Sequence, residues 1–459
     1  MLIAMSGKRR RQFEANWLTW PVDRQGRAFR IRLVEPRTIC PADHPKIFLA
    51  ALQPPEPEYL DDHHQIARRP PANSRFDLLT FPELFLPSNS LVEVLSRIRE
   101  ARIPIGCVHT GLRPPGTDAS STHLFAARNI VGLTSDLAKI PNLVKKDLAP
   151  FQAWLAKQSL DDRFNIGCLF TVDAKCRPRV CLHAKMVSSR DETRPEHELD
   201  MKEANLLSLV TLTPRDRGLL PITIQPLLCS DVLNVSTNSP RNHPLDAITS
   251  ERSCFRKEYS DHIDVVSVAT CTRSALVGAG NGQFAWHQEF RDAFKRAAAD
   301  DQYRRHQFAL FALSNYRDIP AHPTPGKGGL SGVFYPMPLV QTFQLEQVSK
   351  PQSILCHQPS STTQAYAGEN VRWESHDTPC DAQSRRNELG YMVAMDPAVS
   401  RNAIATVFDL TVTHLPRDAN RWARRATIHD LRFYHVATVS PESPEAQFQL
   451  KLLNSRGNS

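Results

Sequence analysis

Short apolar runs alternate with longer amphipathic stretches along most of the chain. The runs short enough for strands cover residues 76–81, 103–109, 166–172, 179–186, 222–228, 263–269 and 308–313. Most of them are continuous rather than alternating, which is typical of strands that are covered on both faces. Apolar residues at helical spacing predict helices over residues 89–101 and 286–300. Strands that alternate with helices predict an α/β fold.

The same pattern separates a body from two extensions. We expect an N-terminal extension at residues 1–45, a body at 46–337 with insertions at 114–162 and 234–260, and a C-terminal extension at 338–459. The N-terminal extension contains one plausible strand at 29–34. In the C-terminal extension, the apolar stretches 403–413 and 426–439 predict a hairpin or added edge strands.

Composition fits a folded protein with a mild excess of positive charge. Of 459 residues, 41% are hydrophobic and 23% are charged, and the formal net charge is +8. The basic residues are spread out except for the run at 8–11, which is typical of a solvated tail. A nucleic-acid or protein partner therefore has no support beyond the net charge.

Several function classes have no signature in the chain. The glycines between 111 and 116 have the spacing of a phosphate-binding loop but lack the lysine that follows it, and there is no serine-hydrolase elbow and no zinc-ligand spacing. No run reaches the about 18 apolar residues that a membrane-spanning helix needs, and the first residues lack the pattern of a secretory leader. We expect a cytoplasmic protein with no membrane partner, whose ten cysteines are free thiols.

Three residues that could carry chemistry lie at or near the ends of buried strands: Glu83, Lys185 and Cys229. A partly desolvated carboxylate has a raised pKa and suits a general base, and a buried ammonium needs a carboxylate such as Glu192 beside it. A thiol at a strand end is accessible, but Asp231 beside it disfavours the thiolate, so a base or cation must come from elsewhere in the chain. Each residue alone also has a structural explanation, as a solvated acid, an edge-strand lysine or a buried thiol.

Taken in order, these segments resemble the nitrilase, or carbon–nitrogen hydrolase, superfamily. The matching pieces are 46–53 as the opening strand, 81–84 around the glutamate, Lys185 with Glu192, 228–231 around the cysteine, 264–269 as the next strand, 286–315 as a long helix with its following strand, and 328–332 as a late Gly–Ser turn. The resemblance covers about 290 residues and implies a four-layer α-β-β-α sandwich. The interval from Glu83 to Lys185 is longer than is usual in the family, and the first insertion has to absorb the excess.

The resemblance also implies roles and partners. Glu83 would be the general base, Lys185 the oxyanion stabiliser and Cys229 the nucleophile of a thioester intermediate, with Glu192 balancing the charge of Lys185 and the N–H of Ser230 binding the oxyanion. No cofactor or metal is required. The implied substrate is a small molecule with a non-peptide amide bond, less readily a nitrile or carbamoyl group, and the implied state is a homo-oligomer.

Two alternatives stay open at the level of sequence. Lys145 also lies in a segment that looks like the lysine segment of the family, although Gln152 and Ala153 stand where its second glutamate is expected. The atypical insertions and extensions would also suit a binding or scaffold module with reduced or lost catalysis, acting in a larger assembly that could involve nucleic acid.

Overall fold

The computed structural model describes a large part of the chain. The described residues are 13–24, 28–38, 43–52, 58–60, 66–68, 76–100, 105–115, 124–173, 175–189, 192, 200–232, 263–272, 309–319, 326–327, 331–336, 354–355, 365–366, 371–374, 389–394, 403–414 and 426–437. The second insertion, most of the segment expected to form the long helix, and most of the linker after residue 337 lie outside these residues.

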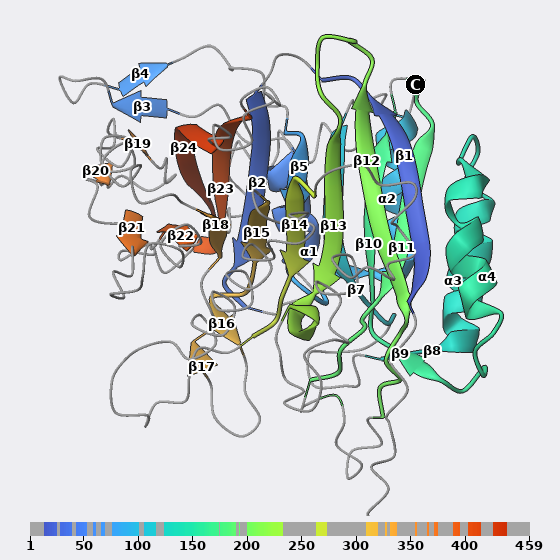
Figure 1. Ribbon diagram of the computed structural model, residues 1–459. Helices are drawn as coiled ribbons and strands as arrows, with labels where there is room; N and C mark the ends of the chain where they lie inside the picture. The colour runs from blue at the N-terminus through green and yellow to red at the C-terminus, as the bar shows by residue number, and fades with distance from the viewer. Residues whose placement is uncertain are drawn as a thin grey trace, which may run out of the picture.

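Two large sheets form the centre of the fold (Figure 1). The first has the strand order β1-β12-β13-β14-β15-β18-β22-β21, with bounds β1 Glu14–Val22, β12 Leu206–Pro214, β13 Ile222–Leu228, β14 Val265–Ala269, β15 Leu310–Ser314, β18 Gly332–Pro336, β22 Leu389–Ala394 and β21 Val371–Glu374. Strands β13, β14 and β15 run parallel to one another at its centre. Their carboxyl ends therefore meet at one edge of the sheet.

The second sheet has the order β11-β10-β7-β5-β2-β23-β24. Its strands are β11 Pro178–Ala184, β10 Ile166–Val172, β7 Ile105–Arg113, β5 Leu78–Thr80, β2 Ala28–Pro36, β23 Ala403–His414 and β24 Ala426–Ala437, and β6 Leu86–Pro87 pairs with β7 beside this path. Strands β2, β5 and β7 are parallel, and β11 has the same direction because two antiparallel pairings through β10 separate it from β7.

The two sheets pack face to face. Strands β2, β5 and β7 of the second sheet contact β14 or β15 of the first, while β10 and β11 contact β13 and β12. Side chains from both sheets form a common apolar cluster, in which Ile31, Leu78 and Leu169 of the second sheet meet Ile224 and Val265 of the first. Burial of both faces of these strands explains why most of the apolar runs in the sequence are continuous rather than alternating.

The described helices cover the outer face of the second sheet. They are α1 His44–Leu52, α2 Ser88–Glu100, α3 Ala127–Ala138 and α4 Ala149–Leu155, joined by the short 3-10 helix η1 Lys145–Asp147. Helices α2 and α4 contact β10 and β11, and α3 packs between α2 and α4. Smaller paired strands are β3 Glu58–Leu60 with β4 Ile66–Arg68, β8 Phe125–Ala126 with β9 Arg163–Phe164, β16 Asp318–Ile319 with β17 Gly326–Lys327, and β19 Ile354–Leu355 with β20 Ala365–Tyr366.

The predicted α/β class is confirmed, and helices, one sheet and a second sheet give three of the expected layers. The helix predicted at 286–300, which would form the fourth layer, lies outside the described residues. The prediction of an opening strand at 46–53 is wrong, because residues 46–52 lie in helix α1. Its buried apolar residues include Ile47, Phe48 and Ala51, and this spacing places them on one helical face.

Both terminal segments take part in the two sheets. Strand β1 pairs with β12 at the edge of the first sheet, and β2 lies between β5 and β23 inside the second. Residues 14–22 and 28–36, which belong to the predicted N-terminal extension, therefore contribute one strand to each sheet. The predicted hairpin is formed by β23 and β24, which extend the second sheet beyond β2.

The described part of the first insertion, residues 114–115 and 124–162, packs against the second sheet. It contains α3, η1 and α4, and the carboxylate of Asp147 receives a bidentate ion pair from Arg179 on β11, with Nη2 and Oδ1 2.9 Å apart. Both side chains are buried, and the guanidinium also lies 5.7 Å from the ring centroid of Trp20. This pairing fixes the insertion as a helical layer of the sandwich.

Candidate active site

The turn after β13 carries Cys229 in a strained conformation. Residues Cys229–Asp231 form a short 3-10 helix, η4, and Cys229 has a φ of 36°, in the left-handed region that a residue with a Cβ rarely adopts. The Asp231 carboxylate accepts backbone N–H groups from Leu228 at 3.0 Å, Met186 at 2.7 Å and Val187 at 2.9 Å. It thereby ties the cysteine turn to the segment after β11, where Lys185 lies. Strain of this kind persists where the surroundings enforce it, and such positions cluster at functional sites.

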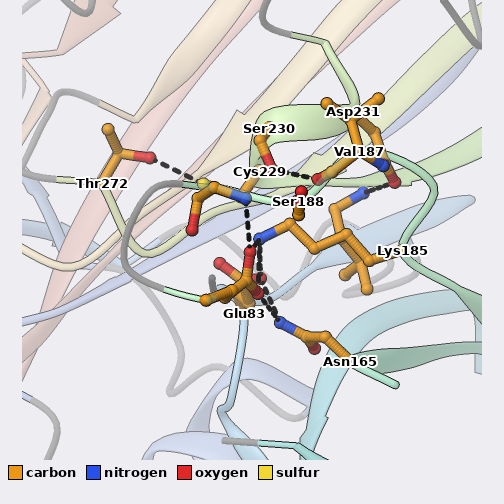
Figure 2. Close-up of polar contacts among 12 residues, drawn as sticks. Glu83, Asn165, Lys185, Val187, Ser188, Cys229, Ser230, Asp231 and Thr272 are labelled. Atoms are coloured by element: carbon orange, nitrogen blue, oxygen red, sulfur yellow. Dashed lines mark hydrogen bonds and ion pairs between the residues drawn. The ribbon is translucent and has the colours of Figure 1, made fainter. Parts of the chain in front are cut away.

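Lys185 links two buried carboxylates. Its Nζ donates to Glu83 Oε1 at 2.9 Å and contacts Glu192 Oε1 at 2.9 Å and Oε2 at 2.8 Å. The side chains of Lys185, Glu83 and Glu192 are 2%, 5% and 8% exposed, so these ion pairs are almost completely removed from solvent. Figure 2 shows the ammonium of Lys185 between the carboxylate of Glu83 and the turn of Cys229.

Asn165, which is not among the residues predicted for the site, completes this arrangement. It lies directly before β10, and its Nδ2 donates to Glu83 Oε1 at 2.7 Å and to Glu192 Oε1 at 2.8 Å. Lys185 and Asn165 therefore bridge the same two oxygen atoms (Figure 2). Glu83 Oε2 makes no hydrogen bond with the residues that the structure describes, so it is available to a proton from another group.

The environment moves the pKa values of the two carboxyls apart. Burial raises the pKa of Glu83, the charge of Glu192 raises it further, and Lys185 opposes both. Burial also acts to raise the pKa of Glu192, but the ion pair and hydrogen bonds from Lys185 and Asn165 bring it below its usual value. Divergent pKa values of this kind separate a proton-accepting carboxyl from a permanently charged one.

The cation and the thiol respond to the same charges. Burial acts to lower the pKa of Lys185, but Glu192 and Glu83 raise it well above its usual value, so the group stays an ammonium. Burial, together with the charge of Glu83, raises the pKa of Cys229 to about 12, and the charge of Lys185 acts to lower it. The resting group is therefore a thiol that needs a base.

The glutamate segment is held by close backbone contacts. A Cβ on Gly111 of β7 would lie 2.5 Å from the Glu83 Cα, so only glycine allows the two segments to approach. Leu84, the next residue, has a φ of 62°, and the Tyr316 hydroxyl donates to the Glu83 carbonyl at 3.0 Å. Both the cysteine turn and the glutamate segment therefore contain a residue with a strained backbone, Cys229 in the first and Leu84 in the second, whose conformation the fold enforces.

The other predicted residues are placed as follows. The Ser230 hydroxyl donates to the Val187 carbonyl, which adds a second tie between the cysteine turn and the lysine segment. Lys145 is exposed on η1, in the helical layer over the outer face of the second sheet, and is not part of this cluster. Of the late Gly–Ser turn, Ser331 is described, and its Oγ accepts the N–H of Asn315 at 3.0 Å.

Metal sites and membrane-spanning helices were sought among the described residues. No group of three or more His, Cys, Asp or Glu side chains among them is arranged to hold a metal ion. No helix in the described part of the chain has the length and apolar character needed to cross a membrane.

Comparison with known proteins gives structural likenesses but no match in sequence. No protein-family model matches the chain, and no curated protein matches it. A carbon–nitrogen hydrolase from Helicobacter pylori aligns with a TM-score of 0.36 and 8% identity over 67% of this chain and 81% of that one. An N-terminal amidase aligns with a TM-score of 0.30 and 7% identity over 60% of this chain and 55% of that one. Because both TM-scores are below 0.5, the interpretation of the site rests on its own geometry.

Proposed function

We propose that the chain is an amidase that hydrolyses a non-peptide carbon–nitrogen bond through a thioester on Cys229. The observation that carries the proposal is the buried Lys185 ammonium, which is paired with Glu83 and Glu192 and tied through Asp231 to the strained cysteine turn. A buried ion pair of this kind contributes little to stability for its cost, so a chemical role explains it better than a structural one.

The first half of the reaction forms the thioester. Glu83 Oε2 accepts the thiol proton of Cys229 while the sulfur attacks the amide carbonyl carbon. The oxygen becomes negative, and the Lys185 ammonium and the backbone N–H of Ser230 stabilise it; one such donor is typically worth about 3 kcal/mol in the transition state. The C–N bond then breaks, and the proton on Glu83 passes to the leaving amine.

The second half restores the enzyme. Glu83 accepts a proton from water, whose oxygen attacks the thioester carbon; the second oxyanion meets the same donors. The C–S bond breaks, the sulfur takes back the proton, and the acid leaves. Glu192 stays ionised throughout, because its lowered pKa keeps it as the permanent counter-charge of Lys185. The residues invoked supply every proton transfer without a cofactor.

Replacement of the proposed nucleophile tests this function. We expect Cys229→Ala to abolish hydrolysis across a panel of small amides, nitriles and carbamoyl compounds, and to remove the iodoacetamide adduct from the peptide that contains residue 229. Cys176→Ala is a matched control, because Cys176 also has a positive φ, 55°, but lies in the turn between β10 and β11 and is partly exposed. The control variant should keep wild-type turnover. Hydrolysis that survives in Cys229→Ala would contradict the proposal.

The oligomeric state and the cellular location of the chain are further predictions. A homo-oligomer and a cytoplasmic location are proposed with the function, and size-exclusion chromatography with light scattering measures the first of them. If no compound in the panel is hydrolysed and Cys229 shows no selective labelling, the scaffold alternative becomes the better account of the fold.

A further inference from the structure

A hydroxyl group lies directly against the proposed nucleophile. Thr272 Oγ1 is 3.0 Å from Cys229 Sγ, and Figure 2 shows the sulfur directed toward Thr272 and away from the lysine segment. The strand topology explains this proximity: β13 and β14 are parallel neighbours with Leu228 opposite Ala269, so the residues that follow the two strands share one edge of the sheet.

The position of Thr272 is fixed from a third strand. Asn315, which follows β15, donates from Nδ2 to the Thr272 carbonyl at 2.9 Å and accepts the Thr272 N–H on Oδ1 at 3.1 Å. The N–H of Asn315 in turn donates to Ser331 Oγ at 3.0 Å. Two hydrogen bonds from the residue after the neighbouring strand therefore fix the backbone of Thr272 at the position from which its hydroxyl reaches the sulfur.

The charges already present in the site disfavour a thiolate at Cys229, and the Thr272 hydroxyl can offset this effect. Glu83 and Glu192 place two carboxylates near the thiol and Lys185 supplies one ammonium, so a thiolate would add a further negative charge to a buried and already acidic cluster. A neutral donor on the sulfur stabilises that charge without adding a cation that would trap Glu83.

The direction of the hydrogen bond makes this stabilisation selective. While the sulfur is protonated, either atom can donate. Once the thiol has lost its proton, only the Thr272 hydroxyl can donate, and a hydrogen bond to an anion is shorter and stronger than one between neutral groups. The interaction is therefore stronger as the nucleophile forms than at rest, which is the condition for a contribution to rate.

We propose that Thr272 is a catalytic residue whose hydroxyl donates to the Cys229 sulfur and stabilises the thiolate as Glu83 removes the thiol proton. The hydroxyl keeps its own proton, and the thiol proton goes to the Glu83 carboxylate. The catalytic meaning of this contact rests on the function proposed above, whereas the reactivity of the sulfur can be measured without any substrate.

Alkylation of the full chain by iodoacetamide tests the proposal, with mass spectrometry of the peptide that contains residue 229 reporting the rate between pH 7 and pH 10. We expect Thr272→Val, which keeps the shape and removes the hydroxyl, to slow alkylation roughly tenfold across this range, because a lost hydrogen bond to an anion raises the thiol pKa by about one unit. Thr272→Ser should react within about threefold of wild type. Thr272→Ala serves as a second truncation if the valine variant does not fold.

Thr171→Val is the matched control for the loss of a buried threonine hydroxyl. Thr171 Oγ1 donates to the Ile105 carbonyl at 3.1 Å, at the end of β10 away from Asn165, so this variant should melt at a lower temperature and leave Cys229 alkylation unchanged.

Wild-type alkylation rates in folded Thr272→Val or Thr272→Ala would overturn the proposal, as would an equal loss in Thr272→Ser. If alkylation slows as expected but wild type hydrolyses no amide, the proposed function fails and the hydroxyl–sulfur contact stands. If Cys229-dependent hydrolysis is found and alkylation does not slow, the function stands and this inference fails.

Discussion

The positions of the two carboxylates in the site depend on an uncharged residue, Asn165. Asn165 is 1% exposed and donates two hydrogen bonds, both to carboxylate oxygens that also contact Lys185. The ammonium alone could draw the two carboxylates close in several geometries, but the fixed angle between the two N–H bonds of one amide sets the distance between the oxygens. Asn165 therefore orients Glu83 so that Oε2 stays unbonded among the described residues.

Replacement of Asn165 should separate the loss of these hydrogen bonds from the addition of charge. We expect Asn165→Leu to lower the free energy of unfolding by about 3 kcal/mol, because two hydrogen bonds to buried anions are lost. Because these hydrogen bonds also act to lower the pKa of Glu83 and Glu192, the deficit should be somewhat smaller at pH 5 than at pH 8. Urea unfolding at pH 5 and pH 8 measures it.

Asn165→Asp should depend more strongly on pH than Asn165→Leu, because the new carboxyl faces two others. Like-charge contact raises its folded-state pKa above the unfolded value of about 4, so the folded state binds its proton more readily. The sign follows from linkage: the destabilisation grows as pH rises above about 4 and shrinks as pH falls. Equal deficits of the aspartate variant at pH 5 and pH 8 would show that the amide does not lie against the two carboxylates.

At the scale of elements, the ends of strands from two sheets carry the site. Cys229, Thr272 and Asn315 follow the parallel strands β13, β14 and β15, while Glu83 and Lys185 follow β5 and β11 in the facing sheet. Asp231 is one of the described links between the sheets at this edge, since its Oδ2 accepts the N–H of Leu228 and its Oδ1 accepts those of Met186 and Val187. The Ser230 hydroxyl, which donates to the Val187 carbonyl, is another.

The link predicts the effect of Asp231→Asn. An asparagine can keep the two bonds to Oδ1, but its NH₂ would then face the N–H of Leu228, so one buried donor is left unsatisfied at a cost of about 1–3 kcal/mol. With the turn loosened, Cys229 should leave its strained φ and react more slowly with iodoacetamide. Asp216→Asn is the control, because Asp216 accepts one N–H, from Gly218, in an exposed turn and should cost less than about 0.5 kcal/mol. A stable Asp231→Asn variant with unchanged labelling would remove Asp231 from this role.

The strands that sequence located best are those buried on both faces. β10 and β13 have the bounds that their apolar runs predict, because every residue of both strands is buried. The run at 46–53 predicts a strand and forms helix α1, since a short apolar run with buried residues at i, i+1 and i+4 does not distinguish the two. β1 and β12 were not predicted, although they pair along their whole length. Such pairing joins residues 14–22 to residues 206–214, a separation that no local pattern carries.

Sequence could propose the site's charged residues but not its neutral ones. Glu83, Lys185 and Cys229 stand at the ends of recognisable strands, and their charges and thiol are unusual in buried positions. Asn165 and Thr272 are common polar types at strand boundaries, where turns use them without any functional role. Their importance comes from which atoms they face, and only the packing of the two sheets determines that.

At the scale of the whole molecule, a chain of buried polar groups joins the two sheets beneath the site. His183 Nε2 lies 3.1 Å from His109 Nε2, His109 Nδ1 lies 2.8 Å from Ser267 Oγ, and Ser267 Oγ lies 2.9 Å from Thr80 Oγ1. His183 Nδ1 has no hydrogen-bond partner among the described residues. A proton on Nε2 of His183 and on Nδ1 of His109 therefore satisfies every N–H of the pair, and both rings are neutral.

This neutral pair predicts loss of stability in acid. Burial lowers the pKa of His183 to about 3 and that of His109 well below its usual value, so between about pH 6.5 and pH 3 the unfolded chain binds protons that the folded chain does not. The stability from each neutral ring is fully present above about pH 6.5 and declines by about 1.4 kcal/mol per pH unit below it.

Asp231, whose pKa burial raises to about 7, acts in the opposite direction, but it does so equally in wild type and in a histidine variant. We expect His183→Gln, which keeps an N–H for His109 and does not titrate, to lose less stability than wild type between pH 7 and pH 5 in urea unfolding. Parallel losses in the two proteins would mean that His183 is not held neutral between the sheets.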